Sequence, residues 1–96
     1  MKSKRTKGSA NVFADLGFDS DEAANLRIRA EMMAALIGSI EKSRLRQAQA
    51  AKLLGITQPR VSNLMQGKIQ LFSIDTLVKL LSKAGHRVNF KLTRAA

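Results

Sequence analysis

The chain contains no cysteine, tryptophan or tyrosine, and it has one proline and one histidine among its 96 residues. Without cysteine it can form no disulfide, perform no thiol chemistry and build no zinc-ribbon site. The single histidine, His86, has no partner set for a metal, so we expect no metal and no other cofactor. No apolar run is long enough to cross a bilayer, which favours a cytoplasmic protein without a membrane partner.

Acidic residues are also scarce. Lysine and arginine number 17 against 7 aspartates and glutamates, which gives a formal net charge of +10. Such a charge attracts polyanions at long range. The basic residues do not line one helix face opposite aromatic side chains, which argues against a membrane surface. Four phenylalanines without tyrosine or tryptophan argue against a base-stacking RNA sheet. Duplex DNA read by a helix is the partner that fits best.

The stretch from Gln47 to Gly67 has the pattern of two short helices joined by a tight turn. Gly55 can adopt the left-handed conformation that ends a helix. Thr57 can cap the next helix, and Pro59 falls in its first turn, where a missing N–H is tolerated. The apolar residues at helical spacing, which we expect to be buried, are Ala48, Ala51, Leu54, Val61, Leu64 and Met65.

The outward face of the second helix carries amides, a hydroxyl and a guanidinium, but no carboxylate. Amides and guanidinium groups make bidentate hydrogen bonds to purine edges in the major groove. A solvent-exposed helix of an ordinary bundle is the alternative, and the Ala–Gly–Ile spacing at Ala51, Gly55 and Ile56 argues against it. The pattern therefore predicts a helix-turn-helix.

One further helix is expected before this motif and one after it. Asp19 and Glu22 form a capping-box pattern at the start of a helix that runs to about Ser43. Ser73 caps a last helix, which ends before Gly85. The buried stripe of the first is Leu26, Ala30, Met33, Ile37 and Ile40; that of the last is Ile74, Leu77, Val78, Leu81 and Ala84, with Leu80 at its flank.

The two ends of the chain differ from this helical centre. Residues 1–10 carry four basic residues and nothing to bury, which predicts a disordered basic tail before a single domain over residues 11–96. The apolar stretch 11–18 is expected to pack either on the body of the domain or on a partner. Residues 86–93 alternate, with Val88, Phe90 and Leu92 on one face, which predicts a strand that covers the helical body.

That strand needs a partner for its backbone groups. The chain offers no convincing second strand, apart from a weak candidate at residues 11–13. Pairing with the same strand of a second copy around a two-fold axis supplies the missing edge. The sequence therefore predicts a homodimer, which would also present two helix-turn-helix units to two DNA half-sites.

This order of elements resembles the lambda-repressor-like (Cro, XRE) helix-turn-helix family, and within it the HigA-like antitoxin branch. The resemblance lies in NVFADLGF at 11–18, GITQPRVSNLMQGK at 55–68 and FSIDTLVKLLSKAGHRVNFKL at 72–92. It implies a mainly all-α domain of four to five helices with a C-terminal β-strand that pairs across a homodimer. It also implies base contacts from Gln58, Pro59, Arg60 and Asn63. Contacts to DNA phosphates would come from Gln47, Thr57, Ser62, Gln66 and Lys68, and dimerisation contacts from Val88, Phe90 and Leu92.

These features favour a sequence-specific repressor of a palindromic, double-stranded operator. The resemblance adds that it is the antitoxin of a toxin–antitoxin operon, which binds a toxin protein and represses its own promoter. A phage-type or metabolic repressor without a toxin partner is the main alternative. An enzyme is disfavoured, because no nucleophile–base pair or phosphate-binding loop is visible. A pure protein-interaction module is disfavoured by the set Gln58, Arg60 and Asn63.

Overall fold

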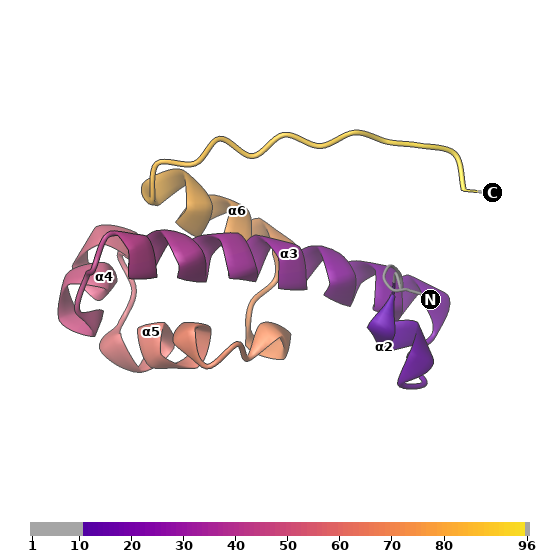
Figure 1. Ribbon diagram of the computed structural model, residues 1–96, viewed down its shortest axis with the longest axis horizontal. Coiled ribbons are helices and arrows are strands. Elements are labelled where there is room, and N and C mark those ends of the chain that lie inside the picture. Colours follow the sequence, from indigo (N-terminus) through magenta and orange to yellow (C-terminus); the bar gives the residue numbers. More distant parts are fainter. Residues whose placement is uncertain (1–10, 96) are drawn as a thin grey trace.

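The computed structural model describes residues 11–95, which fold into an almost entirely helical domain (Figure 1). The elements are α2 (Val12–Asp15), α3 (Ser20–Lys42), α4 (Gln47–Leu54), α5 (Gln58–Met65), the 3-10 helix η1 (Ile69–Leu71) and α6 (Ile74–Lys83). No strand forms within residues 11–95. The helical prediction is confirmed, while the predicted basic tail at 1–10 lies outside the described residues. None of the helices in the described range is long and apolar enough to cross a membrane.

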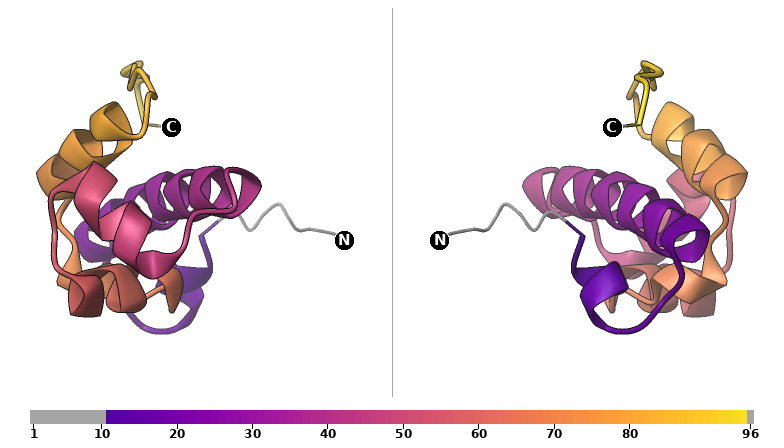
Figure 2. Two further views of the ribbon diagram at one scale, coloured as in Figure 1. Left: turned by 90° about the vertical axis from the view of Figure 1, so that its left-hand side faces the viewer. Right: turned by 90° about the vertical axis from the view of Figure 1, so that its right-hand side faces the viewer.

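Helix α3 is the longest helix of the described residues, and α2, α5, η1 and α6 all pack against it. Asp19 caps it as predicted, because its carboxylate accepts a hydrogen bond from the Glu22 N–H at 2.9 Å. Helices α5 and α6 both pack on α3, below and above it in the view of Figure 1, and α4 contacts both of them near the C-terminal end of α3 (Figures 1 and 2). This arrangement leaves α5 along one edge of the molecule, away from α6.

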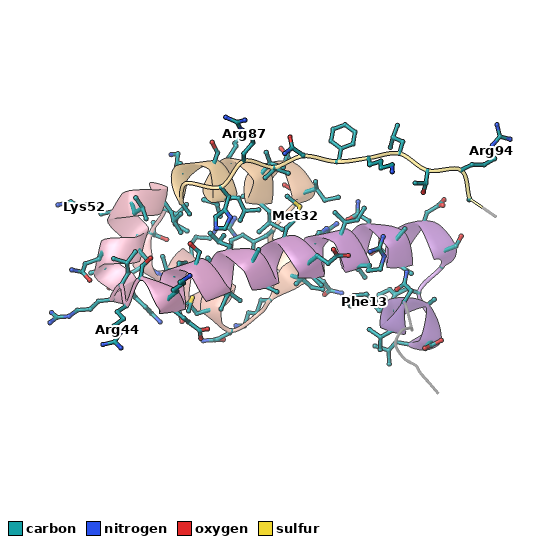
Figure 3. All side chains as sticks on the ribbon, turned by 45° about the horizontal axis from the view of Figure 1, so that its top comes forward. Phe13, Met32, Arg44, Lys52, Arg87 and Arg94 are labelled. Carbon is teal, nitrogen blue, oxygen red and sulfur yellow. The ribbon has the colours of Figure 1, made fainter. Side chains whose placement is uncertain are left out.

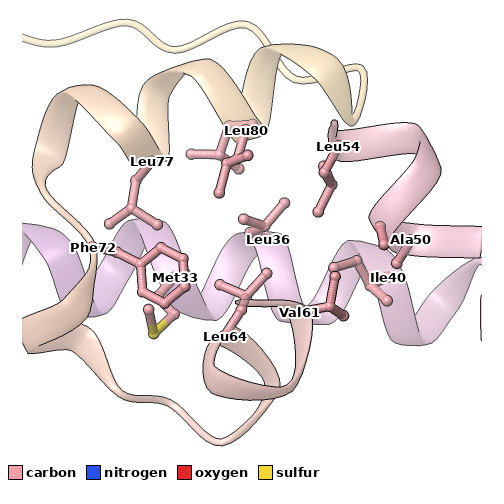
Figure 4. Packing of buried hydrophobic residues seen from close by; sticks show 12 residues of the cluster. Met33, Leu36, Ile40, Ala50, Leu54, Val61, Leu64, Phe72, Leu77 and Leu80 are labelled. Atoms are coloured by element: carbon pink, nitrogen blue, oxygen red, sulfur yellow. The ribbon is translucent and has the colours of Figure 1, made fainter. Parts of the chain in front are cut away.

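The core lies where α3, α4, α5 and α6 converge, and it is entirely apolar (Figure 4). Leu36 and Phe72 are fully buried at its centre. In the predicted stripe of α3, Ala30 and Ile37 are only half-buried, and Leu36 takes the central place. Met33, Leu36 and Ile40 still follow a single stripe at positions i, i+3 and i+7, so packing against the other helices shifts the stripe by one residue, from Ile37 to Leu36. The twelve buried residues of the cluster are Met33, Leu36, Ile40, Ala50, Ala51, Leu54, Val61, Leu64, Phe72, Leu77, Leu80 and Leu81.

Helix α6 begins at the predicted cap. The Ser73 hydroxyl accepts a hydrogen bond from the Thr76 N–H at 3.3 Å and donates one to the Asp75 carboxylate at 2.5 Å. The second bond stabilises the charged carboxylate and lowers the pKa of Asp75. Leu80, predicted at the flank, is buried in the core instead. Gly85 ends the helix with a φ of +91°, as expected for a residue just past a helix end.

The apolar stretch 11–18 forms a short helix that packs on α3. The Asn11 side chain caps α2 by accepting from the Phe13 N–H at 3.1 Å, so the weak strand candidate at 11–13 is wrong. Phe13 and Phe18 meet edge to face, with ring centroids 6.3 Å apart. Internal packing is therefore confirmed for part of the stretch. Val12 and Leu16 stay 56% and 70% exposed, so the stretch also presents an apolar surface.

The C-terminal residues leave α6 in an extended conformation and run back above α3 (Figure 1). A hollow of about 450 Å³ lies between this segment and the two helices α3 and α6. Phe90 and Leu92 are 85% and 86% exposed. These two side chains are thus not buried against the helical body in the single chain, and their predicted burial in a paired strand stays a prediction. Residues 86–93 form no β-strand here, because a β-strand needs a second strand for its backbone hydrogen bonds and residues 11–95 contain none.

The turn between α3 and α4 holds a residue in an unfavourable backbone conformation. Arg44 has a φ of +56° and is the one non-glycine residue between 11 and 95 with a positive φ. It stands at the position after the helix end that favours glycine, since the Leu45 N–H donates to the Ile40 carbonyl at 3.4 Å and the Arg44 N–H to the Glu41 carbonyl at 3.0 Å.

We predict that Arg44→Gly stabilises the protein by about 1 kcal/mol, because glycine adopts the left-handed conformation without the clash of a Cβ atom. For a domain of this size the melting temperature should rise by roughly 4–8 °C. Thermal unfolding followed by circular dichroism measures it. Arg44→Ala is the control, since it removes the side chain but retains the Cβ. If both variants shift the melting temperature alike, the backbone conformation is not the cause.

Candidate nucleic-acid interface

Helix α4 is fixed by small apolar residues. Ala50 and Ala51 are buried together with Leu54, and they let α4 approach its neighbours closely. Ala48, which was predicted to be buried, is exposed because the buried face of α4 is centred on residues 50, 51 and 54. At the start of α4 the Gln49 side-chain oxygen accepts from the Arg46 N–H at 2.9 Å. The sequence gives no sign of this cap at position 46, because the capping oxygen comes from Gln49 and not from a Ser, Thr or Asp at that position.

The turn between α4 and α5 has the predicted geometry. Gly55 adopts the left-handed conformation, with φ +70°, and the Ile56 N–H donates to the Ala51 carbonyl at 3.1 Å. Ile56 is half-buried and packs against the core. Thr57 caps α5, since its hydroxyl accepts from the Arg60 N–H at 3.3 Å. The turn thereby fixes both the angle between the two helices and the first residue of α5, Gln58.

Helix α5 buries one face and presents polar groups on the rest of its surface. Val61 and Leu64 are fully buried, and they hold the helix against α3 and α4. Pro59 lies in the first turn, where no N–H is needed. On the rest of its surface, Gln58, Pro59 and Gln66 are exposed, while Arg60, Ser62 and Asn63 are half-buried. The outward polar groups are thus held on a rigid frame.

Hydrogen bonds connect several of the side chains that were predicted to contact DNA. The Gln66 amide donates to the Ser62 hydroxyl at 3.1 Å, one helical turn away. The Lys68 ammonium donates to the Asn63 side-chain oxygen at 3.5 Å. The structure therefore brings these four residues together in pairs along α5 and its C-terminal end. Gln47, the first residue of α4, is exposed.

A family model described as a helix-turn-helix domain matches residues 12–93. The chain belongs to this helix-turn-helix family. It is similar to a solved chain assigned to the XRE family of transcriptional regulators, with 34% sequence identity and a TM-score of 0.72 over 77% of this chain and 83% of that chain. A search of curated proteins gives no match. The protein is thus a DNA-binding transcriptional regulator of the helix-turn-helix type, with α4 and α5 as the two helices of the motif.

The electrostatics of the helix-turn-helix suit a polyanion. Neither α4 nor α5 contains an acidic residue. Within residues 11–95 one ion pair forms, between Arg27 and Glu31 on the exposed surface of α3. Arg44 and Lys52 lie at the end of the molecule formed by α4 (Figure 3). A basic surface of this kind attracts polyanions such as DNA at long range.

One predicted base-contacting residue, Arg60, has a different environment from the others. Its guanidinium donates to the Leu71 carbonyl at 2.8 Å, and its central carbon lies 4.1 Å from the centroid of the Phe72 ring. Both partners lie more than ten residues after Arg60 in the sequence and outside α5, so the sequence of the helix alone gives no sign of them. The side chain of Arg60 therefore points towards η1, and its guanidinium packs on the ring of Phe72, which is buried.

Proposed function

We propose that this regulator is a repressor that binds a palindromic operator in the promoter of its own operon as a homodimer. The observation that supports it best is the surface of α5, which is rigidly held, lacks carboxylates and presents Gln58, Pro59 and Asn63. Amide side chains suit adenine, with which they make bidentate hydrogen bonds in the major groove. The pyrrolidine ring of Pro59 suits an apolar contact, such as a thymine methyl group.

Contacts to the DNA backbone are assigned to residues around this surface. Gln47 would donate to a phosphate from the first turn of α4, where free N–H groups and the helix dipole also attract anions. Thr57 stands at the start of α5, and Ser62 and Gln66 lie along it. Lys68, which follows the end of α5 and is exposed, supplies a charge. These contacts position the regulator, and Gln58, Pro59 and Asn63 read the sequence.

We predict that the protein binds a duplex from its own promoter more tightly than a random duplex of equal length. If a dimer makes roughly 6–10 phosphate contacts, its affinity should fall about 10³–10⁵-fold between 50 and 200 mM salt. Fluorescence anisotropy with both duplexes over that salt range measures both effects. Equal affinity for the two duplexes would contradict the repressor function.

The C-terminal segment supports the dimer. Its apolar side chains Phe90 and Leu92 are exposed in the single chain, and its backbone has no strand partner within residues 11–95. It lies on the side of the molecule away from α5 (Figures 1 and 2). Antiparallel pairing with a second copy would bury Val88, Phe90 and Leu92 over the hollow beside α3 and α6 and leave both recognition helices uncovered. Half-sites about one DNA turn apart, roughly 34 Å, would then be expected.

We predict that Asn89→Pro weakens the dimer strongly, because proline removes an N–H in the middle of the proposed ladder. Asn89→Ala is the matched control and should leave the dimer intact. Sedimentation equilibrium of the three proteins at tens of micromolar tests this. A monomeric wild type, or a dimer that survives the proline variant, would show that residues 86–93 do not form the interface.

A role as an antitoxin is supported by the surface that α2 shares with η1. A hollow of about 480 Å³ lies there, lined mainly by apolar side chains that include Phe13, Leu16 and Leu71. Leu16 and Leu71 are 70% and 49% exposed. Exposed apolar patches of this kind mark protein-interaction sites. We propose that a toxin protein binds here; a phage-type or metabolic repressor would have no such partner.

We predict that the product of the gene next to this one co-purifies with the protein when the two are co-expressed. Leu16→Ser should reduce the amount retained, because it removes exposed apolar area without disturbing the core. Leu53→Ser, which alters a half-exposed leucine on α4, is the control. A neighbouring product that is not retained by the wild type, or is retained equally by all three proteins, would contradict the antitoxin role at this surface.

A further inference from the structure

Two arginines from different helices hold η1, the short helix that follows the recognition helix. Arg60 of α5 donates to the Leu71 carbonyl at 2.8 Å, and Arg29 of α3 donates to the Ile69 carbonyl at 3.4 Å. Arg29 is itself held by the Asn25 side-chain oxygen, 2.6 Å from its Nε. A three-residue helix has few internal hydrogen bonds, so these outside donors help to fix its position, together with the packing of Ile69 against the core.

The Arg60 contact has a second component. Phe72 is fully buried, and its ring receives the Arg60 guanidinium at 4.1 Å from the centroid. A planar cation on an aromatic face is held by the electrostatic attraction of the ring as well as by packing. Stacking and the bond to Leu71 fix the same guanidinium in two directions. In the free protein the guanidinium of Arg60 is therefore held against η1 and Phe72.

The position of Arg60 on the helix agrees with this. It is the residue before Val61, which points straight into the core, so Arg60 lies on the flank of α5 that faces η1. Pro59 and Asn63 are roughly opposite the buried face, as the helical period requires. Arg60 is thus placed beside η1, while Pro59 and Asn63 are placed outward.

We propose that Arg60 is a positioning residue, which clamps η1 to the N-terminal half of the recognition helix and so sets the phosphate contacts of the loop that follows. The exposed polar side chains between Gly67 and Phe72 are Lys68 and Gln70. Base reading is then left to Gln58, Pro59 and Asn63. This inference rests on the proposed operator binding, and it assigns Arg60 to affinity instead of sequence discrimination.

The clamp requires an arginine. A lysine at position 60 would keep the charge but lose the planar group that stacks on Phe72 while it donates to Leu71. The clamp also requires the ring, since leucine at position 72 would retain an apolar side chain but remove the π face. Arg60→Lys and Phe72→Leu should therefore have related effects on DNA binding, even though one alters the surface and the other alters the core.

The test compares Arg60→Ala, Arg60→Lys, Phe72→Leu and the double variant with the wild type on the promoter duplex and on a random duplex. Lys79→Ala is the control for loss of one charge, because Lys79 is exposed on α6, away from α5. Asn63→Ala is the control for loss of a base contact. All measurements are made well below each melting temperature, and circular dichroism verifies that each variant is folded.

We expect Arg60→Ala to weaken binding to both duplexes by a similar factor, roughly five- to tenfold near 150 mM salt, and to reduce the salt slope by about 1. Arg60→Lys should restore little of this loss, and Phe72→Leu should add nothing to Arg60→Ala in the double variant. Asn63→Ala should affect the promoter duplex alone, and Lys79→Ala neither duplex.

Two results would overturn the inference. A loss with Arg60→Ala on the promoter duplex only, of about 10–100-fold, would make Arg60 a base reader. A lower melting temperature with unchanged affinity for both duplexes would make the contact merely structural. Failure of the wild type to distinguish the two duplexes is a separate outcome, since it contradicts the proposed operator binding and not the clamp.

Discussion

The burial of α3 is the interaction on which the rest of the structure depends. Leu36 is fully buried, and Met33 and Ile40 almost so, where α4, α5, η1 and α6 pack around this helix. Each of those elements has ten residues or fewer and would be marginal by itself. Their stability and their relative orientation both come from the apolar surface that they share with α3. The angle at which α5 is presented is therefore a consequence of core packing.

A rigid frame of this kind suits a surface that must match DNA. Gly55 and Thr57 fix the start of α5, and Val61 and Leu64 anchor its inner face, so that its outward groups have little freedom. Side chains that are held before binding lose less conformational entropy when the complex forms. The charge of this surface also suits DNA. Neither α4 nor α5 contains an acidic residue that would repel the phosphates.

The exposed apolar surfaces lie away from α5 or at its edge. The C-terminal segment carries Phe90 and Leu92 in the open, and α2 presents Leu16 beside η1. In a chain with a net charge of +10, charge alone favours solubility, so that such surfaces can persist. We interpret them as surfaces for protein partners, with a second copy on one and a toxin protein on the other.

The sequence by itself determined the helices and the turn of the helix-turn-helix. Capping residues such as Asp19, Thr57 and Ser73, and the glycine at 55, act on neighbours a few residues away, so their effects can be deduced from spacing. Only the tertiary structure decided which groups meet across the fold. The placement of Arg60 on Phe72, the burial of Leu80 and the exposure of Phe90 depend on elements that are distant in the chain. No local rule of capping or periodicity contains that information, because it arises when the helices pack.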